Sequence, residues 1–372
     1  MEAPLRPRSR ANHTHLCNTS ARAPSNQRSP PALPQMTPAH WQLLRATSRS
    51  FYLSLRVLPR PVREPIGLAY LLARTTDTVA DAEQLPVNDR LQLLDRMRRQ
   101  IAGLADPGPL PLPRPANPDA ARPEEKLLLH WPASLAALGL LPPEDQNEVR
   151  TVLHHILNGQ TWDLARFGTP GRSPLGPIAV TTAEELDHYT YCVAGSVGEF
   201  WSRVCRRHLF PREPLREPEW LAQAVQFGKG LQLVNVLRDC AADLRQGRCY
   251  LPAVELQALG LQPPDLLDPQ SWPRVKPCYE HWRQRAMAFL EAGWAYTLAI
   301  PAHQKRLRLA CAWPLLLGVR TLQELGRVNP LDPAQRVKIP RREVRRWIWR
   351  SLAGSVLPRV WARLFHRALH TS

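Results

Sequence analysis

The chain has 372 residues, of which 44% are hydrophobic and 22% are charged. Twelve Trp and long periodic apolar segments exclude a wholly disordered protein. The formal net charge of +17 indicates an anionic partner, such as nucleic acid, a lipid surface or a phosphorylated substrate. Seven scattered Cys without a CxxC pair argue against a disulfide scaffold or a zinc knuckle and fit a reducing compartment.

The positive charge is concentrated at the two ends of the chain. Residues 1–37 carry net +4, residues 336–372 carry ten Lys or Arg against one Glu, and residues 38–335 carry only +4. We therefore predict a disordered Pro- and Arg-rich leader over 1–37, a globular domain over 38–335 and a basic tail over 336–372. The leader lacks the apolar run of a signal peptide, and no apolar stretch is long enough to predict a transmembrane helix.

The apolar residues of the domain follow a helical period. Residues 91–101 and 149–157 each place their apolar side chains on one side of a helix, and sustained period-two alternation is absent. Pro-rich breaks at 105–123, 168–177 and 263–277 predict loops between helices. The expected fold class is all-α, a helical bundle without βαβ alternation.

The first acidic segment runs from Tyr70 to Asp81. Asp77 and Asp81 stand one helical turn apart on one face, with Arg74 three residues before Asp77. Taken alone, this pattern is typical of a solvated helix face in which Arg74 neutralises the carboxylates.

A stretch of small residues follows at 193–198, Val-Ala-Gly-Ser-Val-Gly, and it favours close helix packing. Upstream, Asp163 lies three residues before Arg166, a spacing typical of a surface ion pair on a helix.

The second acidic segment is embedded in apolar sequence. Its polar residues fall on one helix face at steps of three, four and four: Gln232, Asn235, Asp239 and Asp243. The remaining sides are apolar, so this stripe must face a wet cavity, since burying unpaired carboxylates costs too much.

The two acidic segments together indicate one chemistry. Carboxylate and amide oxygens facing a shared cavity suit Mg²⁺, which keeps waters and completes its shell with phosphate oxygens. Arg49, Arg74 and Arg238 could bind the same phosphates. The pattern thus predicts ionisation of an allylic diphosphate, with an apolar tunnel for the hydrocarbon.

From about Trp41 to about Leu325 the chain resembles the squalene and phytoene synthases, the head-to-head trans-isoprenyl diphosphate synthases. The resemblance rests on residues 48–51 (SRSF), 70–81, 189–198 (YTYCVAGSVG) and 232–252. It implies an isoprenoid-synthase fold with a central cavity between two Asp-rich helices. The stretch 231–252 looks most like bacterial squalene synthases, which serve isoprenoid, sterol and hopanoid biosynthesis.

The resemblance also implies roles for individual residues. Asp77 and Asp81 would bind Mg²⁺ with the first diphosphate. The second metal-binding face would consist of Asn235, Asp239 and Asp243. The substrate-binding residues would be Arg74, Gln232 and Arg238 at the diphosphate, Ser48, Arg49 and Ser50 at the cavity mouth, and Tyr70 at the diphosphate site.

A functional tyrosine is implied as well, assisting proton or cation handling. Tyr189 matches it, but the family often has Tyr-Cys where this chain has Tyr189-Thr190, so Tyr191 stays an alternative. The first motif also departs from many animal and fungal members, since Ala82 replaces the acidic residue after Asp81.

The expected reaction is Mg²⁺-dependent condensation of two farnesyl diphosphates to presqualene diphosphate, followed by NADPH-dependent reduction to squalene. The alternatives are a phytoene or dehydrosqualene synthase without reduction, or a presqualene diphosphate synthase only. No GxGxxG follows a strand, so a Rossmann site for NADPH is not expected. Nucleic acid is not an expected partner, since the body is nearly neutral and no nucleic-acid motif is present.

The basic tail predicts where the enzyme sits. Its arginines alternate with the apolar residues Trp347, Ile348, Trp349, Leu352, Val356, Leu357, Val360, Trp361, Leu364 and Phe365. This amphipathic pattern predicts a peripheral anchor on an anionic membrane, at the inner face of the cytoplasmic membrane. A solvated terminal helix is the alternative.

Overall fold

Helices make up 77% of the described chain and strands almost none of it, which confirms the predicted all-α fold. The structure, a computed structural model, describes residues 36–48, 51–106, 108–111, 121–168, 176–355 and 358–369. All of them belong to one compact unit, Pro34–Ser372. The predicted leader, except for its last two residues, lies outside the described residues, as do Val356 and Leu357 of the tail.

The elements in the first half of the chain are α1 (Pro38–Thr47), α2 (Phe51–Val57), α3 (Arg60–Ala80), α4 (Val87–Ala102), α5 (Pro123–Leu129), α6 (Trp131–Leu140), α7 (Pro143–Phe167), β1 (Ile178–Ala179), α8 (Ala183–Thr190), the π-helix η1 (Tyr191–Gly195) and α9 (Ser196–Leu209). The second half contains α10 (Glu217–Arg238), α11 (Cys240–Arg245), β2 (Arg248–Cys249), α12 (Ala253–Ala258), the 3₁₀ turns η2 (Pro263–Leu267) and η3 (Pro269–Ser271), α13 (Trp272–Ala299), α14 (Lys305–Leu325), the 3₁₀ turn η4 (Pro333–Gln335), α15 (Arg341–Gly354), α16 (Pro358–Ala362) and α17 (Leu364–Leu369).

The two periodic segments are helical as predicted, within α4 and α7. The loop predicted over 263–277 is partly wrong, because α13 begins at Trp272 and continues through Pro277. Pro273 occupies the first turn, where its missing N–H costs nothing. Pro277 removes one hydrogen bond near the start of a 28-residue helix, which packing elsewhere along the helix offsets.

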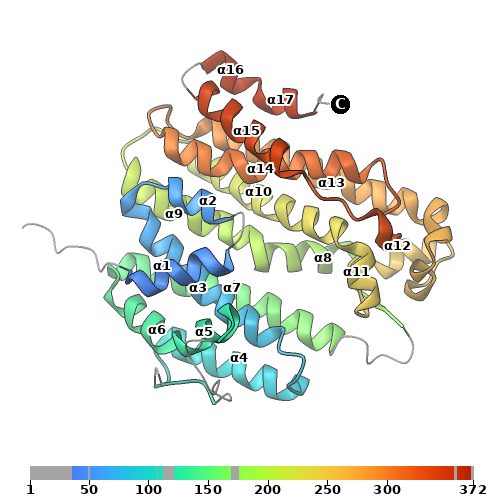
Figure 1. Cartoon of the computed structure of the whole chain (residues 1–372), viewed down its shortest axis with the longest axis horizontal. Helices are drawn as coiled ribbons and strands as arrows, with labels where there is room; N and C mark the ends of the chain where they lie inside the picture. Colours follow the sequence, from blue (N-terminus) through green and yellow to red (C-terminus); the bar gives the residue numbers. More distant parts are fainter. Residues whose placement is uncertain are drawn as a thin grey trace, which may run out of the picture. The chain divides into compact units, whose positions relative to one another are not determined.

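Helix α10 is central to the packing. It lies along α13 and also contacts α9, η1 and α14 (Figure 1). Helix α3 packs against α7 and α9, and α7 contacts both α9 and η1. This arrangement holds α3 and α10 on opposite walls of one cavity, with α7 and η1 between them.

Close approach of α10 to the segment before it depends on glycine. A Cβ on Gly198 of α9 would overlap the carbonyl oxygen of Ala224 in α10, and one on Gly228 would overlap the carbonyl oxygen of Ala194 in η1. The two contacts are reciprocal, so the small residues at 193–198 do serve close packing. They bring η1 and α9, which follow Tyr189 in the chain, against α10, which carries Gln232.

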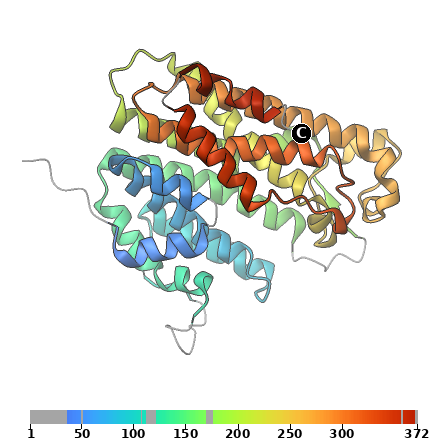
Figure 2. The same cartoon turned by 45° about the horizontal axis from the view of Figure 1, so that its top comes forward.

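The described residues contain one small sheet, in which β1 and β2 pair in parallel with Ile178 opposite Arg248. It ties the segment after α11 to the segment before α8. No helix among the described residues is long and apolar enough to cross a membrane. At the carboxyl-terminal end, α15 and α17 lie against α14 (Figure 2).

We predict that Gly198→Ala and Gly228→Ala each lower the free energy of unfolding by about 2–3 kcal/mol, because a backbone carbonyl cannot move out of the way of the new methyl group. Gly139→Ala is the matched control. That exposed site in α6 has no atom within 4 Å of the new Cβ, so it should gain about 0.5–1 kcal/mol. Thermal unfolding followed by circular dichroism measures all three, and equal midpoints would contradict the close-packing account.

Candidate active site

A cavity of about 700 Å³ lies between α3, α7, η1 and α10. Its polar lining consists of Thr47, Ser48, Tyr70, Arg74, Asp77, Asp81, Gln160, Asp163, Tyr189, Gln232, Asn235, Arg238 and Arg248. Its apolar lining consists of Ala73, Ala80, Ile156, Leu164, Val193 and Val197. One cavity thus combines carboxylates, guanidinium groups and an apolar wall.

Helix α3 contributes the acidic residues because its other faces are buried. Leu68, Leu72 and Val79 pack into the core, which turns Asp77 and Asp81 toward the cavity. The carboxylate of Asp77 forms an ion pair with Arg74 one turn earlier. The structure therefore places these carboxylates at a cavity, and the solvated outer face that the spacing alone suggested is wrong.

The cavity carboxylates resist ionisation because they are buried. The Asp77 side chain keeps 41% of its surface accessible, facing the cavity. Burial within the protein and the nearby charge of Asp81 raise the pKa of Asp77 to about 6. Burial also raises the pKa values of Asp81 and Asp163. Several acids that resist ionisation around one cavity mark a place where a cation would bind.

The second acidic segment is only partly as predicted. Gln232 and Asn235 line the cavity, but the helix is interrupted at Asp239, where α10 ends and α11 begins. Asp239 and Asp243 are consequently not among the lining residues. Asp239 pairs with Arg238 at 2.5 Å and lies 3.4 Å from Arg336.

Asp243 remains electrostatically part of the site. Burial and the charge of Asp239 raise its pKa to about 7, and Arg248 and Asp163 of the cavity also act on it. Arg336, which sequence reasoning assigned to the membrane tail, is instead near the second acidic segment.

The sequence analysis did not assign three residues that lie at or beside the cavity: Asp163, Arg248 and Tyr250. Asp163 does not pair with Arg166, whose guanidinium donates to the carbonyl of Ala179. Asp163 instead accepts a 2.5 Å hydrogen bond from the Tyr250 hydroxyl and lies 3.4 Å from Arg248. A usable signal was Gln160, a second polar residue three positions before Asp163 on the same face of α7. Arg248 and Tyr250 belong to the 232–252 stretch but looked like a plain helix end.

The two candidate tyrosines differ in position, and only Tyr189 is among the residues that line the cavity. Tyr189 lines the cavity, and its ring stacks on that of Tyr250 with centroids 5.3 Å apart. Tyr191 lies elsewhere, with its hydroxyl 3.4 Å from Glu199 and its ring against His155. Burial raises the pKa of the Tyr189 hydroxyl, so it keeps its proton at neutral pH.

Of the residues expected at the cavity mouth, Ser48 lines the cavity, and Arg49 and Ser50 lie outside the described residues. Tyr70 donates a hydrogen bond to the carbonyl of Thr47 at 3.3 Å and stacks on Phe51.

The cavity residues fit one mode of Mg²⁺ binding. The described residues contain no group of three or more His, Cys, Asp or Glu side chains close enough to hold an ion by themselves. Mg²⁺ is usually bound through one or two carboxylates with the remaining positions filled by water and substrate phosphate. Asp77 and Asp81, which line an open cavity together with arginines that could bind phosphate, match that mode.

Comparison with known proteins identifies the family. A family model described as squalene/phytoene synthase matches residues 44–343. The chain belongs to the squalene/phytoene synthase family. Members of this family are prenyltransferases of isoprenoid biosynthesis, so the cavity is the candidate active site of such an enzyme.

Individual relatives differ in their reactions. A bifunctional lycopene cyclase/phytoene synthase of Blakeslea trispora is 28% identical over 57% of this chain and 32% of its own length. Squalene synthase of Saccharomyces cerevisiae is 25% identical over 76% of this chain and 60% of its own length. A presqualene diphosphate synthase of Rhodopseudomonas palustris is 28% identical over 59% of this chain and 64% of its own length. The chain thus spans about a third to two thirds of these relatives.

Among solved structures, the complex of TcSQS with the ligand E5700 superposes with a TM-score of 0.71, at 20% identity, covering 89% of this chain and 90% of that one. This likeness shows the shared fold.

We predict that Asp243→Asn stabilises the metal-free protein at pH 8 by about 2 kcal/mol, because the carboxylate ionises more easily in the unfolded chain than in the folded one. Because the pKa is raised in the folded protein, ionised Asp243 destabilises the fold. This destabilisation is fully present above about pH 7 and disappears progressively toward pH 4. The gain should therefore shrink on acidification. Asp95→Asn, on the exposed face of α4, is the control. Urea unfolding in EDTA from pH 5 to 8 measures both, and a gain independent of pH would contradict the account.

Proposed function

We propose that this protein condenses two farnesyl diphosphates head to head into presqualene diphosphate and reduces that product to squalene with NADPH. The observation that carries the proposal is one cavity that combines three aspartates (Asp77, Asp81 and Asp163), three arginines (Arg74, Arg238 and Arg248) and an apolar wall. Such a cavity suits two diphosphates and two hydrocarbon chains side by side.

The residues of the cavity suggest how the reaction would be supported. Arg74, Arg238 and Arg248 present guanidinium groups that would orient the diphosphate oxygens. Asp77 and Asp81 on one wall, and Asn235 with Asp239 and Asp243 on the other, would hold Mg²⁺. When bound, Mg²⁺ supplies positive charge against the leaving diphosphate.

The apolar lining would protect the allylic cation. Water, which would otherwise capture the cation, would be excluded by four apolar lining residues: Val193, Val197, Ile156 and Leu164. Tyr189 lines the same cavity. Its ring stacks on Tyr250, and the Tyr250 hydroxyl donates a hydrogen bond to Asp163. We assign Tyr189 the role of holding a proton near the reacting carbons.

Reduction is the part of the proposal supported by sequence resemblance. The described residues contain no βαβ unit with a glycine-rich turn, so NADPH would bind without a Rossmann site. The competing functions are a phytoene or dehydrosqualene synthase, which forms its product without reduction, and a presqualene diphosphate synthase. We also propose a peripheral location on the inner face of the cytoplasmic membrane.

A product assay decides the reaction. With farnesyl diphosphate and Mg²⁺, we expect presqualene diphosphate without NADPH and squalene only with it. Phytoene formed from geranylgeranyl diphosphate would overturn the choice of substrate. Release of no pyrophosphate from either substrate would overturn the enzymatic proposal.

Variants of the acidic residues test the metal assignment. Asp77→Asn and Asp239→Asn should each lower turnover at least about a hundredfold, because each removes negative charge needed to hold the metal against the diphosphate. Asp95→Asn should leave turnover unchanged. Circular dichroism checks that the variants stay helical, and near-normal activity of either cavity variant would contradict the assignment.

A further inference from the structure

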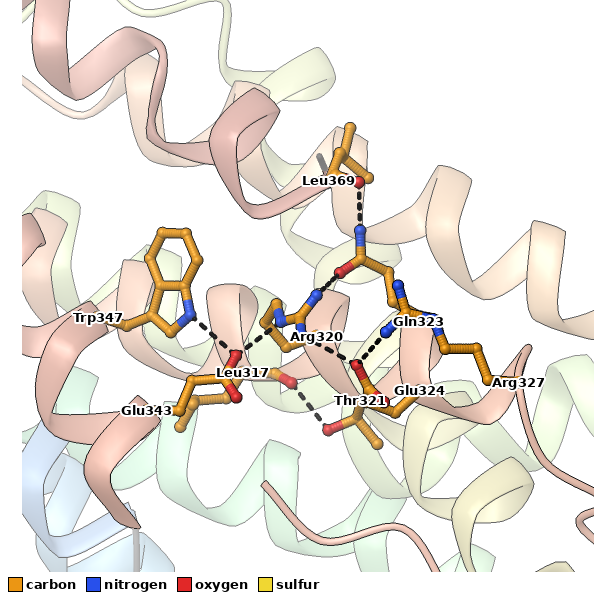
Figure 3. A network of polar contacts seen from close by, with 9 residues as sticks. All are labelled: Leu317, Arg320, Thr321, Gln323, Glu324, Arg327, Glu343, Trp347 and Leu369. Carbon is orange, nitrogen blue, oxygen red and sulfur yellow. Dashed lines mark hydrogen bonds and ion pairs between the residues drawn. The ribbon is translucent and has the colours of Figure 1, made fainter. Parts of the chain in front are cut away.

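The carboxyl-terminal helices are held to the body by a buried arginine. Arg320 of α14, only 4% exposed, donates from Nε to Glu343 of α15 at 2.7 Å, and also pairs with Glu324 (Figure 3). The indole of Trp347 donates to the same Glu343 oxygen. Gln323 donates to the backbone carbonyl of Leu369 in α17. Both ends of the tail are thereby fixed to α14.

One apolar side of the tail is buried inside the protein. Five of its apolar residues are at most 3% exposed: Trp347, Trp361, Leu364, Phe365 and Ala368. Trp361 and Phe365 pack on Trp294 of α13, with ring centroids 5.6 and 5.9 Å apart. Four of these residues, Trp347, Trp361, Leu364 and Phe365, belong to the apolar set expected to face a membrane. For these four the expectation is wrong, because they complete the core.

A second apolar set remains on the outside. Two stripes run along the outer side of α15, each with two arginines in the first half and apolar residues in the second: Arg341, Arg345, Ile348, Leu352 and Arg342, Arg346, Trp349, Ala353. Trp349 is 71% exposed and Leu352 is 37% exposed. An exposed Trp is costly in water and typical of a surface that docks.

The patch continues onto α2 through an apolar groove. Val344 and Ile348 of α15 line it together with Phe51 and Leu53 of α2, and Leu53 is 40% exposed. Phe51 stacks on Tyr70, which lines the catalytic cavity, with ring centroids 5.1 Å apart. One aromatic pair therefore separates the groove from the site of catalysis.

The charge around this patch has one sign. Arg341, Arg342, Arg345 and Arg346 are all exposed. Glu343, the acidic residue of α15, points inward to Arg320. A positive rim around exposed Trp and Leu complements a surface that is negatively charged at its edge and apolar beneath.

We propose that this outer face, made of Arg341, Arg342, Arg345, Arg346, Ile348, Trp349 and Leu352 of α15 with Leu53 of α2, docks on a bilayer of anionic phospholipid. The arginines contact the headgroups, and Trp349, Leu352 and Leu53 enter the interface. The groove then opens toward the acyl chains, where a hydrocarbon product dissolves. That last step rests on the proposed function, whereas docking itself does not.

Co-sedimentation of the full-length protein with vesicles, in the absence of substrate, tests the proposal. The probes are vesicles of phosphatidylcholine with 30% phosphatidylglycerol and vesicles of phosphatidylcholine alone. We expect binding to the former, weakened by salt. Trp349→Ser with Leu53→Ser, and separately Arg342→Gln with Arg346→Gln, should each weaken binding about tenfold or more.

Matched controls exclude general effects of charge and hydrophobicity. Leu140→Ser removes a leucine of α6 that is 67% exposed, and Arg96→Gln with Arg99→Gln removes the same charge from the exposed face of α4. Both controls should bind vesicles as the native chain does, and all variants should keep its unfolding temperature, since every changed side chain is exposed.

Three results would overturn the proposal. The first is vesicle binding that the α15 variants do not weaken more than the controls. The second is a dimer in analytical ultracentrifugation that Trp349→Ser dissociates, which would assign the face to a second copy of the chain. The third is absence of vesicle binding together with tight binding to nucleic acid. Because no turnover is measured, these outcomes are independent of which prenyl product the enzyme makes.

Discussion

The site depends on carboxylates that are buried close together around one cavity, where desolvation makes their ionisation costly. Burial raises the pKa of Asp77 to about 6 and that of Asp243 to about 7, so ionising both in the ligand-free protein is costly. That cost would favour binding, since a divalent cation bound together with a diphosphate would satisfy both the carboxylates and the neighbouring arginines. The rest of the helical fold keeps this arrangement from collapsing.

Two structural devices keep the cavity open and its walls in position. Reciprocal glycine contacts bring η1 and α9 against α10 at backbone distance, so Tyr189 and Gln232 sit on one continuous wall. The short parallel pairing of β1 with β2 fixes the chain on either side of Arg248, and Tyr250 then reaches Asp163. Neither device holds substrate, yet both determine where the reactive groups lie.

Sequence reasoning succeeded where a local pattern carries the information. Helical periodicity placed α4 and α7, and the spacing of Asp77 and Asp81 placed both carboxylates on one face of α3. It failed where the outcome depends on tertiary contacts. The spacing suggests that Asp163 pairs with Arg166 one turn away, but the packing of α7 directs it to Tyr250, 87 residues later in the chain. Likewise, the tail is amphipathic by sequence, and only the buried Arg320 shows which apolar side faces the protein.

The central claim is that the two acidic segments, one with Asp77 and Asp81 and one with Asp239 and Asp243, hold metal and diphosphate as one unit. The most direct measurement is the thermal unfolding midpoint with Mg²⁺ alone, inorganic pyrophosphate alone, and both together. Our account predicts a large increase only with both, and the loss of nearly all of it in Asp77→Asn, in Asp243→Asn and in the double variant alike. A full increase with pyrophosphate alone, or losses in the two single variants that add up in the double variant, would contradict it.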